Sequence, residues 1–168
     1  MKRILGVDPG LKVTGYAVIE VEGSGSRGFK LVEAGCIQPK KDSDLPQRLD
    51  KIYFHLREVI QQHQPQVMVL EKLYAHHRHP ATVSVLGHVR GVICLVSVHC
   101  QIKLAEYSVK RIRKSLLGQG GSGKQQTREV VARFFKIPVE KLTLDASDAI
   151  ALGLGYCHMT RGLKGMSL

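Results

Sequence analysis

The sequence lacks the features that mark membrane-spanning, secreted and disulfide-rich proteins. No apolar run approaches the ~20 residues of a membrane span, and the best stretch, residues 92–98, is far too short. The chain reaches Asp8 and a Pro-Gly turn too soon for a signal peptide. Its four cysteines form no C-x-x-C pair, so they predict reduced buried thiols and neither a zinc ribbon nor a disulfide framework. We therefore expect a cytoplasmic protein with no membrane partner.

Acidic residues are scarce relative to basic ones. The chain has 14 Asp and Glu against 25 Lys and Arg, and its formal net charge is +11. This surplus points to a polyanionic partner, with nucleic acid as the leading candidate. More than half of it lies in residues 101–128, where a single acid, Glu106, stands among seven basic residues: Lys103, Lys110, Arg111, Arg113, Lys114, Lys124 and Arg128. A solvated helix face is the ordinary interpretation of such a run, but the imbalance and a neighbouring glycine-rich loop favour phosphate contact.

The order of apolar segments predicts an α/β fold. Three strands in succession, at residues 4–8, 13–21 and 29–38, favour an antiparallel meander. Two more strands, at residues 66–71 and 102–107, are separated by a helical segment. The expected helices span residues 45–60, 81–100, 108–117 and 124–136, and a last one begins near Asp145. With no repeat and no long linker, residues 1–168 are expected to form one domain, a mixed five-stranded sheet flanked by helices.

The segment 81–100 is apolar nearly all round. We interpret it as a buried helix, although its Val and Ile content leaves a strand open. Gly87 and Gly91, four residues apart, would allow close helix contact inside the fold or across a dimer.

Four acids stand where the predicted fold gathers side chains. Asp8 and Glu71 each end an apolar strand, and Asp145 and Asp148, three apart at a helix start, share one helix face. Taken singly, Asp8 suits an ordinary turn, Glu71 suits the first solvated position after a strand, and Asp145 with Asp148 suits a capping box. Taken together, they suit an oxygen-ligand site for Mg²⁺ or Mn²⁺, in which two ions ~3.5–4 Å apart clamp a phosphodiester during in-line attack. An acidic metal pocket on a basic surface is typical of a nuclease.

The sequence resembles the RuvC-type Holliday junction resolvases, in motifs that run in order from the first strand to the last helix. The matching motifs are Gly6-Val7-Asp8-Pro9-Gly10 with Val13-Thr14-Gly15-Tyr16, Asp44-Leu45-Pro46-Gln47-Arg48-Leu49, Leu86-Gly87-His88-Val89-Arg90-Gly91 and Asp145-Ala146-Ser147-Asp148-Ala149. The resemblance implies an RNase H-like fold, a homodimer and partnership with the RuvAB branch-migration complex. It also implies symmetric nicking of four-way DNA junctions with two Mg²⁺ ions, for which Mn²⁺ would substitute, leaving a 5′-phosphate and a 3′-hydroxyl.

The resemblance also assigns roles to individual residues. Asp8, Glu71, Asp145 and Asp148 correspond to the catalytic, metal-binding carboxylates of the family. Tyr74 takes the place of an aromatic residue, commonly Phe, that stacks at the junction core. Arg113 stands where the family usually has Lys and Lys124 matches a second basic position; because Arg stays protonated near neutral pH, Arg113 could supply only phosphate contact. The predicted DNA-binding residues are Tyr74, Lys110, Arg113, Lys114 and Lys124.

Two other motifs predict less than they first suggest. Residues 118–125 differ from a Walker A loop in having Gln125 where Ser or Thr should follow the lysine, and the preceding segment has a helical pattern instead of a strand pattern. His76, His77 and His79 lack the spacing of a structural zinc site. The loop that holds these histidines also diverges from the family pattern.

Two rival functions remain open at the level of sequence. One is a related RNase H-fold nuclease acting on structured RNA. The other is a junction-binding protein without catalysis, which the change to Arg113 makes worth testing, although all four acids are intact. The chain is too short for the two lobes of an actin-like ATPase, whose first strand carries a similar motif.

Overall fold

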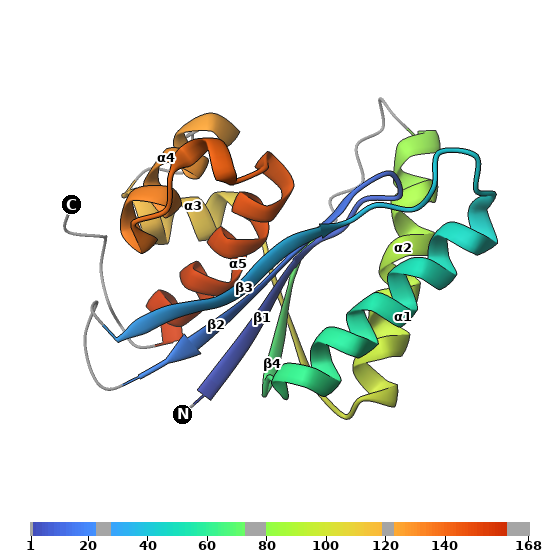
Figure 1. Ribbon diagram of the computed structural model, residues 1–168, viewed down its shortest axis with the longest axis horizontal. Helices are drawn as coiled ribbons and strands as arrows, with labels where there is room; N and C mark the ends of the chain where they lie inside the picture. Colours follow the sequence, from blue (N-terminus) through green and yellow to red (C-terminus); the bar gives the residue numbers. More distant parts are fainter. Residues whose placement is uncertain (1, 23–27, 73–79, 119–122, 161–168) are drawn as a thin grey trace.

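A mixed five-stranded sheet in the order β3-β2-β1-β4-β5 forms the centre of the fold (Figure 1). The computed structural model describes residues 2–22, 28–72, 80–118 and 123–160. Its strands are β1 (Lys2–Asp8), β2 (Thr14–Val21), β3 (Phe29–Ile37), β4 (Val67–Glu71) and β5 (Lys103–Tyr107). The first three form the antiparallel meander that the sequence predicts, while β4 runs parallel to β1 and β5 runs parallel to β4. The predicted sheet is therefore confirmed.

Two layers of helices enclose this sheet (Figure 1). The helices are α1 (Leu45–His63), α2 (Pro80–His99), α3 (Val109–Leu117), α4 (Lys124–Phe135) and α5 (Leu144–Thr160), with a 3-10 turn, η1, at Val139–Lys141. Helices α1 and α2 pack with one sheet face around Leu5, Val18 and Met68. Helices α3, α4 and α5 pack with the other face around Ile4, Ile19 and Val69. Alternation along each strand thus supplies both cores from the same segments.

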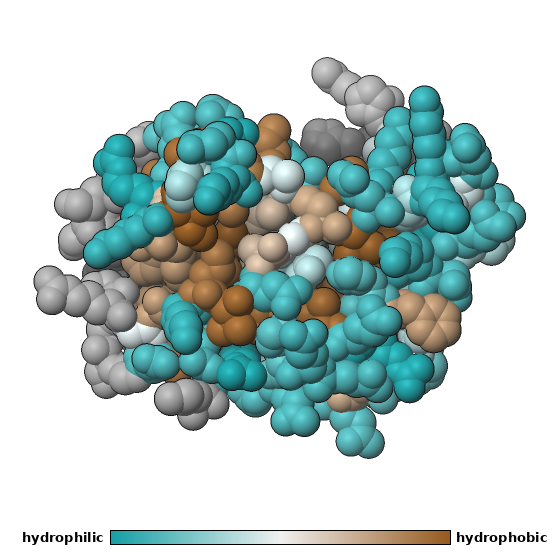
Figure 2. Space-filling model, in the orientation of Figure 1, coloured by the Kyte–Doolittle hydropathy of each residue, from teal (hydrophilic) through white to brown (hydrophobic). Residues whose placement is uncertain are grey.

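Local signals fix where α1 begins and how it faces the solvent. Asp44 accepts a hydrogen bond from the Gln47 backbone N–H, and the Gln47 side chain accepts one from the Asp44 N–H, which completes a capping box. The inward residues Ile52, Leu56 and Ile60 recur at helical spacing. Hydrophilic residues cover most of the outward face of α1 in Figure 2. Helix α1 is thus an ordinary amphipathic helix.

Helix α5 lies unusually close to β1 and β2, the first two strands of the meander. A Cβ added at Gly6 would lie 2.1 Å from the Ala149 backbone oxygen, and one added at Gly15 would lie 2.1 Å from the Asp145 backbone oxygen. Any side chain at either position would therefore push the helix away from the sheet. Since Asp145 begins the acidic end of α5, these glycines set the distance between that end and β1.

Helix α2 is a helix, as predicted, but it is not buried all round. By length and composition it is the one helix in the described part of the chain that could cross a membrane, at Thr82–His99. Its inner residues Val89, Ile93 and Val96 are completely buried against the sheet and α1. The opposite side is open: Leu95 is 48% exposed and Val98 is 70% exposed. The expectation of full burial is wrong because an apolar helix shows no periodicity to indicate which side meets the core.

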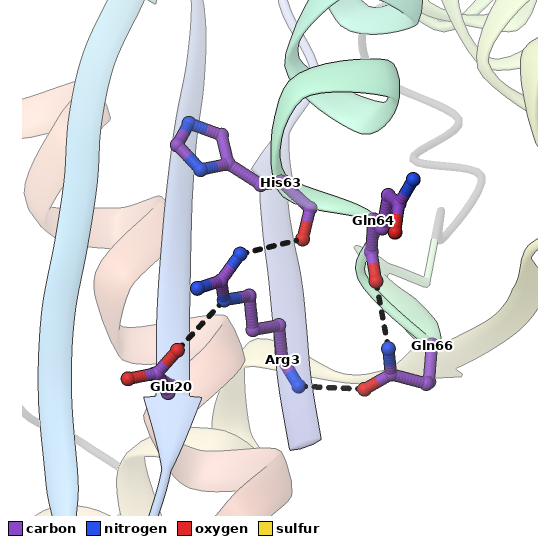
Figure 3. A network of polar contacts seen from close by, with 5 residues as sticks. All are labelled: Arg3, Glu20, His63, Gln64 and Gln66. Carbon is purple, nitrogen blue, oxygen red and sulfur yellow. Dashed lines mark hydrogen bonds and ion pairs between the residues drawn. The ribbon is translucent and has the colours of Figure 1, made fainter. Parts of the chain in front are cut away.

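A polar network lies at the end of the sheet where β1 and β4 begin, away from Asp8 and Glu71 (Figure 3). Arg3 of β1 pairs through Nε with Glu20 Oε2 of β2 at 2.8 Å and donates through Nη1 to the His63 backbone oxygen at the end of α1. The Arg3 backbone N–H donates to Gln66 Oε1, whose amide in turn donates to the Gln64 backbone oxygen. The network ties the end of α1 and the approach to β4 to the first strand.

The sequence also makes predictions for the cysteines and for the first hairpin. The four cysteines form no disulfide with one another. Cys157 is buried and the other three are half-buried, so the expectation of buried thiols holds for Cys157 alone. The predicted flexible turn at residues 23–26 lies outside the described residues.

Candidate active site

Asp8 and Glu71 are brought together by the parallel pairing of β1 with β4. Val7 pairs with Leu70, so the next residues, Asp8 and Glu71, end neighbouring strands at the same sheet edge. Strands lie ~4.8 Å apart, which puts the two carboxylates within reach of a common ligand. The juxtaposition that the sequence predicts for these two acids is present in the structure.

The first turn of α5 brings the other two acids to the same edge, and they are not its cap. Thr143 is the capping residue: its Oγ1 accepts from the Ala146 backbone N–H at 3.2 Å, and its carbonyl accepts from the Ser147 N–H. The capping-box interpretation of Asp145 and Asp148 is therefore wrong by position, since the helix begins at Leu144. Both carboxylates are left for other contacts, one turn apart on the same face.

Three of the four acids line one small cavity. Its walls are Asp8, Glu71, Ile112, Arg113, Asp148, Ala151 and Leu152, and its volume is about 20 Å³. A space of this size holds about one water-sized occupant. Asp145 does not line it but lies close enough for its charge to raise the pKa of Asp8. The four predicted carboxylates thus converge, with three at the cavity and one beside it.

The crowding of these acids changes their protonation. Burial is the main cause that raises the pKa of Asp8 to about 7. The negative charges of Asp148, Glu71 and Asp145 raise it further, and the positive charge of Lys124 lowers it. The pKa of Glu71 is also raised, mainly by burial and then by Asp148, against the positive charges of Lys124, Arg113 and Arg90. Negative charge is therefore incompletely balanced in the protein alone.

Two cations from the predicted set reach the acids. Lys124, the first residue of α4, places Nζ 2.8 Å from Asp148 Oδ2. Its burial disfavours the charged ammonium, but the hydrogen bond to Asp148 and the charges of Asp148, Asp8 and Asp145 outweigh this, so the pKa of Lys124 is raised. Arg113 of α3 lies 3.8 Å from Asp148 Oδ1 and contributes to the cavity wall. Both cations therefore lie beside the acidic cavity, in contact with Asp148.

Sequence reasoning missed the role of Arg90. Its guanidinium reaches from α2 to the far ends of two strands, donating to the Glu71 backbone oxygen and pairing with the Glu106 carboxylate of β5. The side chain is only 14% exposed. The partners of Arg90 lie 16 and 19 positions away along the chain, and no local sequence pattern indicates these contacts. Arg90 is a positioning residue for Glu71.

The remaining predicted DNA-binding residues divide into two groups. Lys110 and Lys114 are exposed on α3, and their spacing from Arg113 puts all three on one face of that helix. Tyr74 lies outside the described residues, as do His76, His77 and His79. Of the Walker-like loop, Gly118 ends α3 and Gly123 precedes α4; α3 is a helix where a P-loop would follow a strand, so the structure supports the view that this is no P-loop.

The donor set suits a hard divalent cation. Its oxygen ligands are those that Mg²⁺ and Mn²⁺ prefer, and the raised pKa of Asp8 marks a site where added positive charge would restore ionised carboxylates. Within the described ranges, no three Asp, Glu, His or Cys side chains are already drawn together as metal ligands. The ion pair between Lys124 and Asp148 accounts for part of this, because it directs one carboxylate oxygen toward the lysine.

Comparisons with known proteins agree with the geometry. A family model described as "Crossover junction endodeoxyribonuclease RuvC" matches residues 4–158. A protein of that name from Dechloromonas aromatica is 34% identical over 165 residues, covering 98% of this chain and 89% of the relative. One from Photorhabdus laumondii is 35% identical over 163 residues, covering 97% and 91%. The solved structure of T. thermophilus RuvC in complex with a Holliday junction substrate matches with TM-score 0.85 at 18% identity, covering 97% of this chain and 98% of that one. The structural likeness confirms the RNase H-like fold.

Proposed function

The chain belongs to the RuvC family of crossover junction endodeoxyribonucleases, and we propose that it resolves four-way (Holliday) DNA junctions by hydrolysing one phosphodiester bond in each of two opposed strands. The observation that carries this proposal is the convergence of acids from β1, β4 and α5 on one cavity beside Lys124 and Arg113. We also propose that residues 1–168 act as a single nuclease domain.

Asp8, Glu71, Asp145 and Asp148 are the proposed catalytic and metal-binding residues. RuvC-family members use divalent metal ions, and two Mg²⁺ ions per site, replaceable by Mn²⁺, would activate the attacking water and stabilise the leaving oxygen. Partial burial holds these carboxylates away from bulk solvent, and their mutual repulsion favours a cation over the empty site. The products would be a 5′-phosphate and a 3′-hydroxyl.

Lys124 and Arg113 are proposed to hold the scissile phosphate. In the protein alone Lys124 acts as the counter-ion of Asp148, and a phosphate arriving with its cations would offer the ammonium a second anionic partner. Arg113 keeps its charge at every working pH and has a planar fork of donors, so it suits phosphate contact but not proton transfer. Lys110 and Lys114 would extend this contact along α3, and Tyr74 would stack on unpaired bases at the junction core.

The outer face of α2 is the proposed homodimer surface. Gly87, Gly91, Leu95 and Val98 follow one another at helical spacing on the side opposite Val89, Ile93 and Val96, and all four are exposed. A Cβ added at Gly87 or Gly91 would meet no atom of the described residues within 4 Å, which leaves room on this face for a second helix. A two-fold axis through this face would give two equal active sites, as paired nicks require.

The proposed function also has an expected protein partner and an expected cellular compartment. The family resemblance implies the RuvAB branch-migration complex as a partner. A chromosomal DNA substrate makes the cytoplasm the expected compartment.

Cleavage of a mobile synthetic four-way junction in Mg²⁺, with nick positions mapped on each strand, tests the proposal. The protein should nick two opposed strands symmetrically, and structured RNA in the same buffer should remain intact. Asp8→Asn, which keeps the side-chain shape, should retain junction binding and lose cleavage. Asp50→Asn, which changes an exposed acid on α1, serves as the matched control and should cleave normally.

Three results would contradict the proposal. Full cleavage by Asp8→Asn would overturn the metal-site assignment. Preferential cutting of structured RNA would favour the RNA nuclease. Binding of the junction without any single-turnover cleavage by the wild type would indicate a non-catalytic junction-binding protein.

A further inference from the structure

A second hollow lies at the sheet edge that carries the acids, on the side away from α3. It is lined by Lys12, Gln38, Pro39, Lys41 and Arg48 and has a volume of about 370 Å³; we call it the basic hollow. Lys12 belongs to the connection that follows Asp8, and Gln38 follows the last residue of β3 directly. Figure 2 shows hydrophilic side chains over the connection between β3 and α1, at the right of the view. The proposed catalytic residues do not include any of these five.

The lining has one sign of charge. Three of its five residues are cations and one is an amide, and none of those described is acidic. Two acids lie close by along the chain, Asp42 next to Lys41 and Asp44 at the cap of α1, where it accepts the Gln47 N–H. Neither of them lines the hollow. A concave surface with three cations selects an anion, and phosphate oxygens match both ammonium and guanidinium donors.

Part of this lining is already held in place. Arg48 donates through Nε to the Ser43 backbone oxygen at 2.8 Å and through Nη2 to the Lys41 backbone oxygen at 2.6 Å. These bonds fix both the guanidinium and the loop that carries Lys41. A guanidinium has five N–H donors in total, so two such bonds do not exhaust it. Ordering of these groups before binding reduces the entropy that a ligand would otherwise have to supply.

The sheet register gives the separation between the basic hollow and the acids. Asp8 pairs with Gly15, and Gly15 pairs with Cys36, so the three residues lie on one line across three strands. At about 4.8 Å per strand step, Cys36 lies roughly 10 Å from Asp8, and Gln38 is two residues farther along. The hollow therefore begins roughly 10–15 Å from the carboxylates, which is about three to four nucleotides at the rise of about 3.4 Å for each nucleotide of a strand.

From this geometry we propose that the basic hollow binds a backbone phosphate of the cleaved strand, about three to four nucleotides from the nick. The proposal rests on the proposed function, because it takes the scissile phosphate to lie at Asp8 and Glu71. The hollow contributes affinity and fixes the DNA arm in position, and it reads no base. Together with Lys110 and Lys114 on the far side of the acids, it gives the junction phosphate contacts on both flanks of the cut.

The double variant Lys12→Gln with Lys41→Gln tests the binding role. Its matched control is Lys2→Gln with Lys30→Gln, which removes two exposed lysines from the opposite sheet edge. In EDTA, at about 0.1 M salt, the hollow variant should bind the junction about tenfold more weakly, and the slope of log K against log salt should fall by about one to two. The control should match the wild type. At saturating protein the single-turnover cleavage rate in Mg²⁺ should be the same for all three.

Neutral methylphosphonates placed singly at the second to seventh phosphates from the nick then locate the contact. The wild type should lose affinity at one or two neighbouring positions about three to four nucleotides from the nick. The hollow variant should show no further loss there, since the two changes remove one interaction. Equal junction affinity of the hollow variant and the control would overturn the assignment, and so would losses of affinity that add at every methylphosphonate position. In either case, cleavage by the wild type would still uphold the proposed function. A wild type that nicks no four-way junction would overturn both.

Discussion

Helices α2 and α5 are both apolar nearly all round, yet the rest of the chain encloses only α5. From Ala146 to His158 every residue of α5 except Asp148 is buried, between the sheet, α3 and α4. Helix α2 buries one stripe and leaves Gly87, Gly91, Leu95 and Val98 exposed. Gly6 and Gly15 of the sheet allow the close approach of α5, whereas no atom of the described residues occupies the space beside Gly87 and Gly91 of α2. The same composition thus serves a core helix in one case and an unpartnered face in the other.

Glycine substitution gives the largest contrast between the two regions. Gly15→Ala should lower the free energy of unfolding by about 3 kcal/mol or more and abolish cleavage, because the new Cβ meets the Asp145 backbone at the acidic end of α5. Gly91→Ala, the control, should raise the stability of the isolated subunit by up to about 1 kcal/mol through helix propensity. Urea unfolding measures both. Equal losses in the two variants would break the comparison.

Asp8, at the end of β1, should make stability depend on pH when no divalent metal is present. The native pKa of Asp8, about 7, is above its unfolded value of 3.8, so the native state binds more protons between these values. The free energy of unfolding should therefore fall as the pH rises from about 4 to about 7. The fall should be at most about 1.4 kcal/mol for each pH unit in this range. Urea titrations in EDTA across this range should show the fall.

Asp8→Asn removes this titration, so its stability should exceed that of the wild type by a margin that grows with pH. Added Mg²⁺ should narrow the margin by stabilising the ionised wild type. Asp50→Asn is the control and should follow the wild type. Parallel curves for Asp8→Asn and the wild type would show that burial of Asp8 does not shift its pKa.

Arg90 is the polar contribution of α2 to the site, and its loss should have an intermediate effect. Arg90→Lys keeps the charge but cannot bridge the Glu71 carbonyl and the Glu106 carboxylate with a planar fork. We expect a loss of about 1.5–3 kcal/mol in stability and a higher Mg²⁺ concentration for half-maximal cleavage, with junction binding in EDTA unchanged. Arg57→Lys, at an exposed position on α1, should change neither. An unaltered Mg²⁺ requirement in Arg90→Lys would mean that Glu71 is positioned without it.

A substitution on the outer face of α2 should have the smallest effect on the stability of a subunit and a clear effect on dimer assembly. Leu95→Glu should leave subunit stability within about 0.5 kcal/mol of the wild type but shift the protein from dimer to monomer in sedimentation measurements. Phe54 on α1 is exposed to the same extent, 48%, so Phe54→Glu is a matched control that should remain dimeric. A dimeric Leu95→Glu would move the interface away from α2.

Much of the fold follows from local sequence signals. The apolar runs and the Pro-Gly turn after Asp8 predict β1 and the meander, and Asp44 with Pro46 predicts the start of α1. The convergence of Asp8 with Glu71 also follows, because parallel strands that end in acids present them at one edge. The cap of α5 did not follow, since a shift of one or two residues in the helix start exchanges Asp145 for Thr143.

By itself, the sequence determined the order of strands and helices, the four acids and the basic surplus, because periodicity, strand ends and charge are properties of neighbouring residues. Only the tertiary structure decided which side of α2 stays open, that Arg90 reaches Glu71 and Glu106, and that Lys12 and Lys41 line one hollow. These relations join residues far apart in the chain, and their geometry depends on strand register and on how closely helices approach the sheet. Gly6 and Gly15 show the link between the two levels: each is one position in the sequence, but what it permits is set by the backbone of α5.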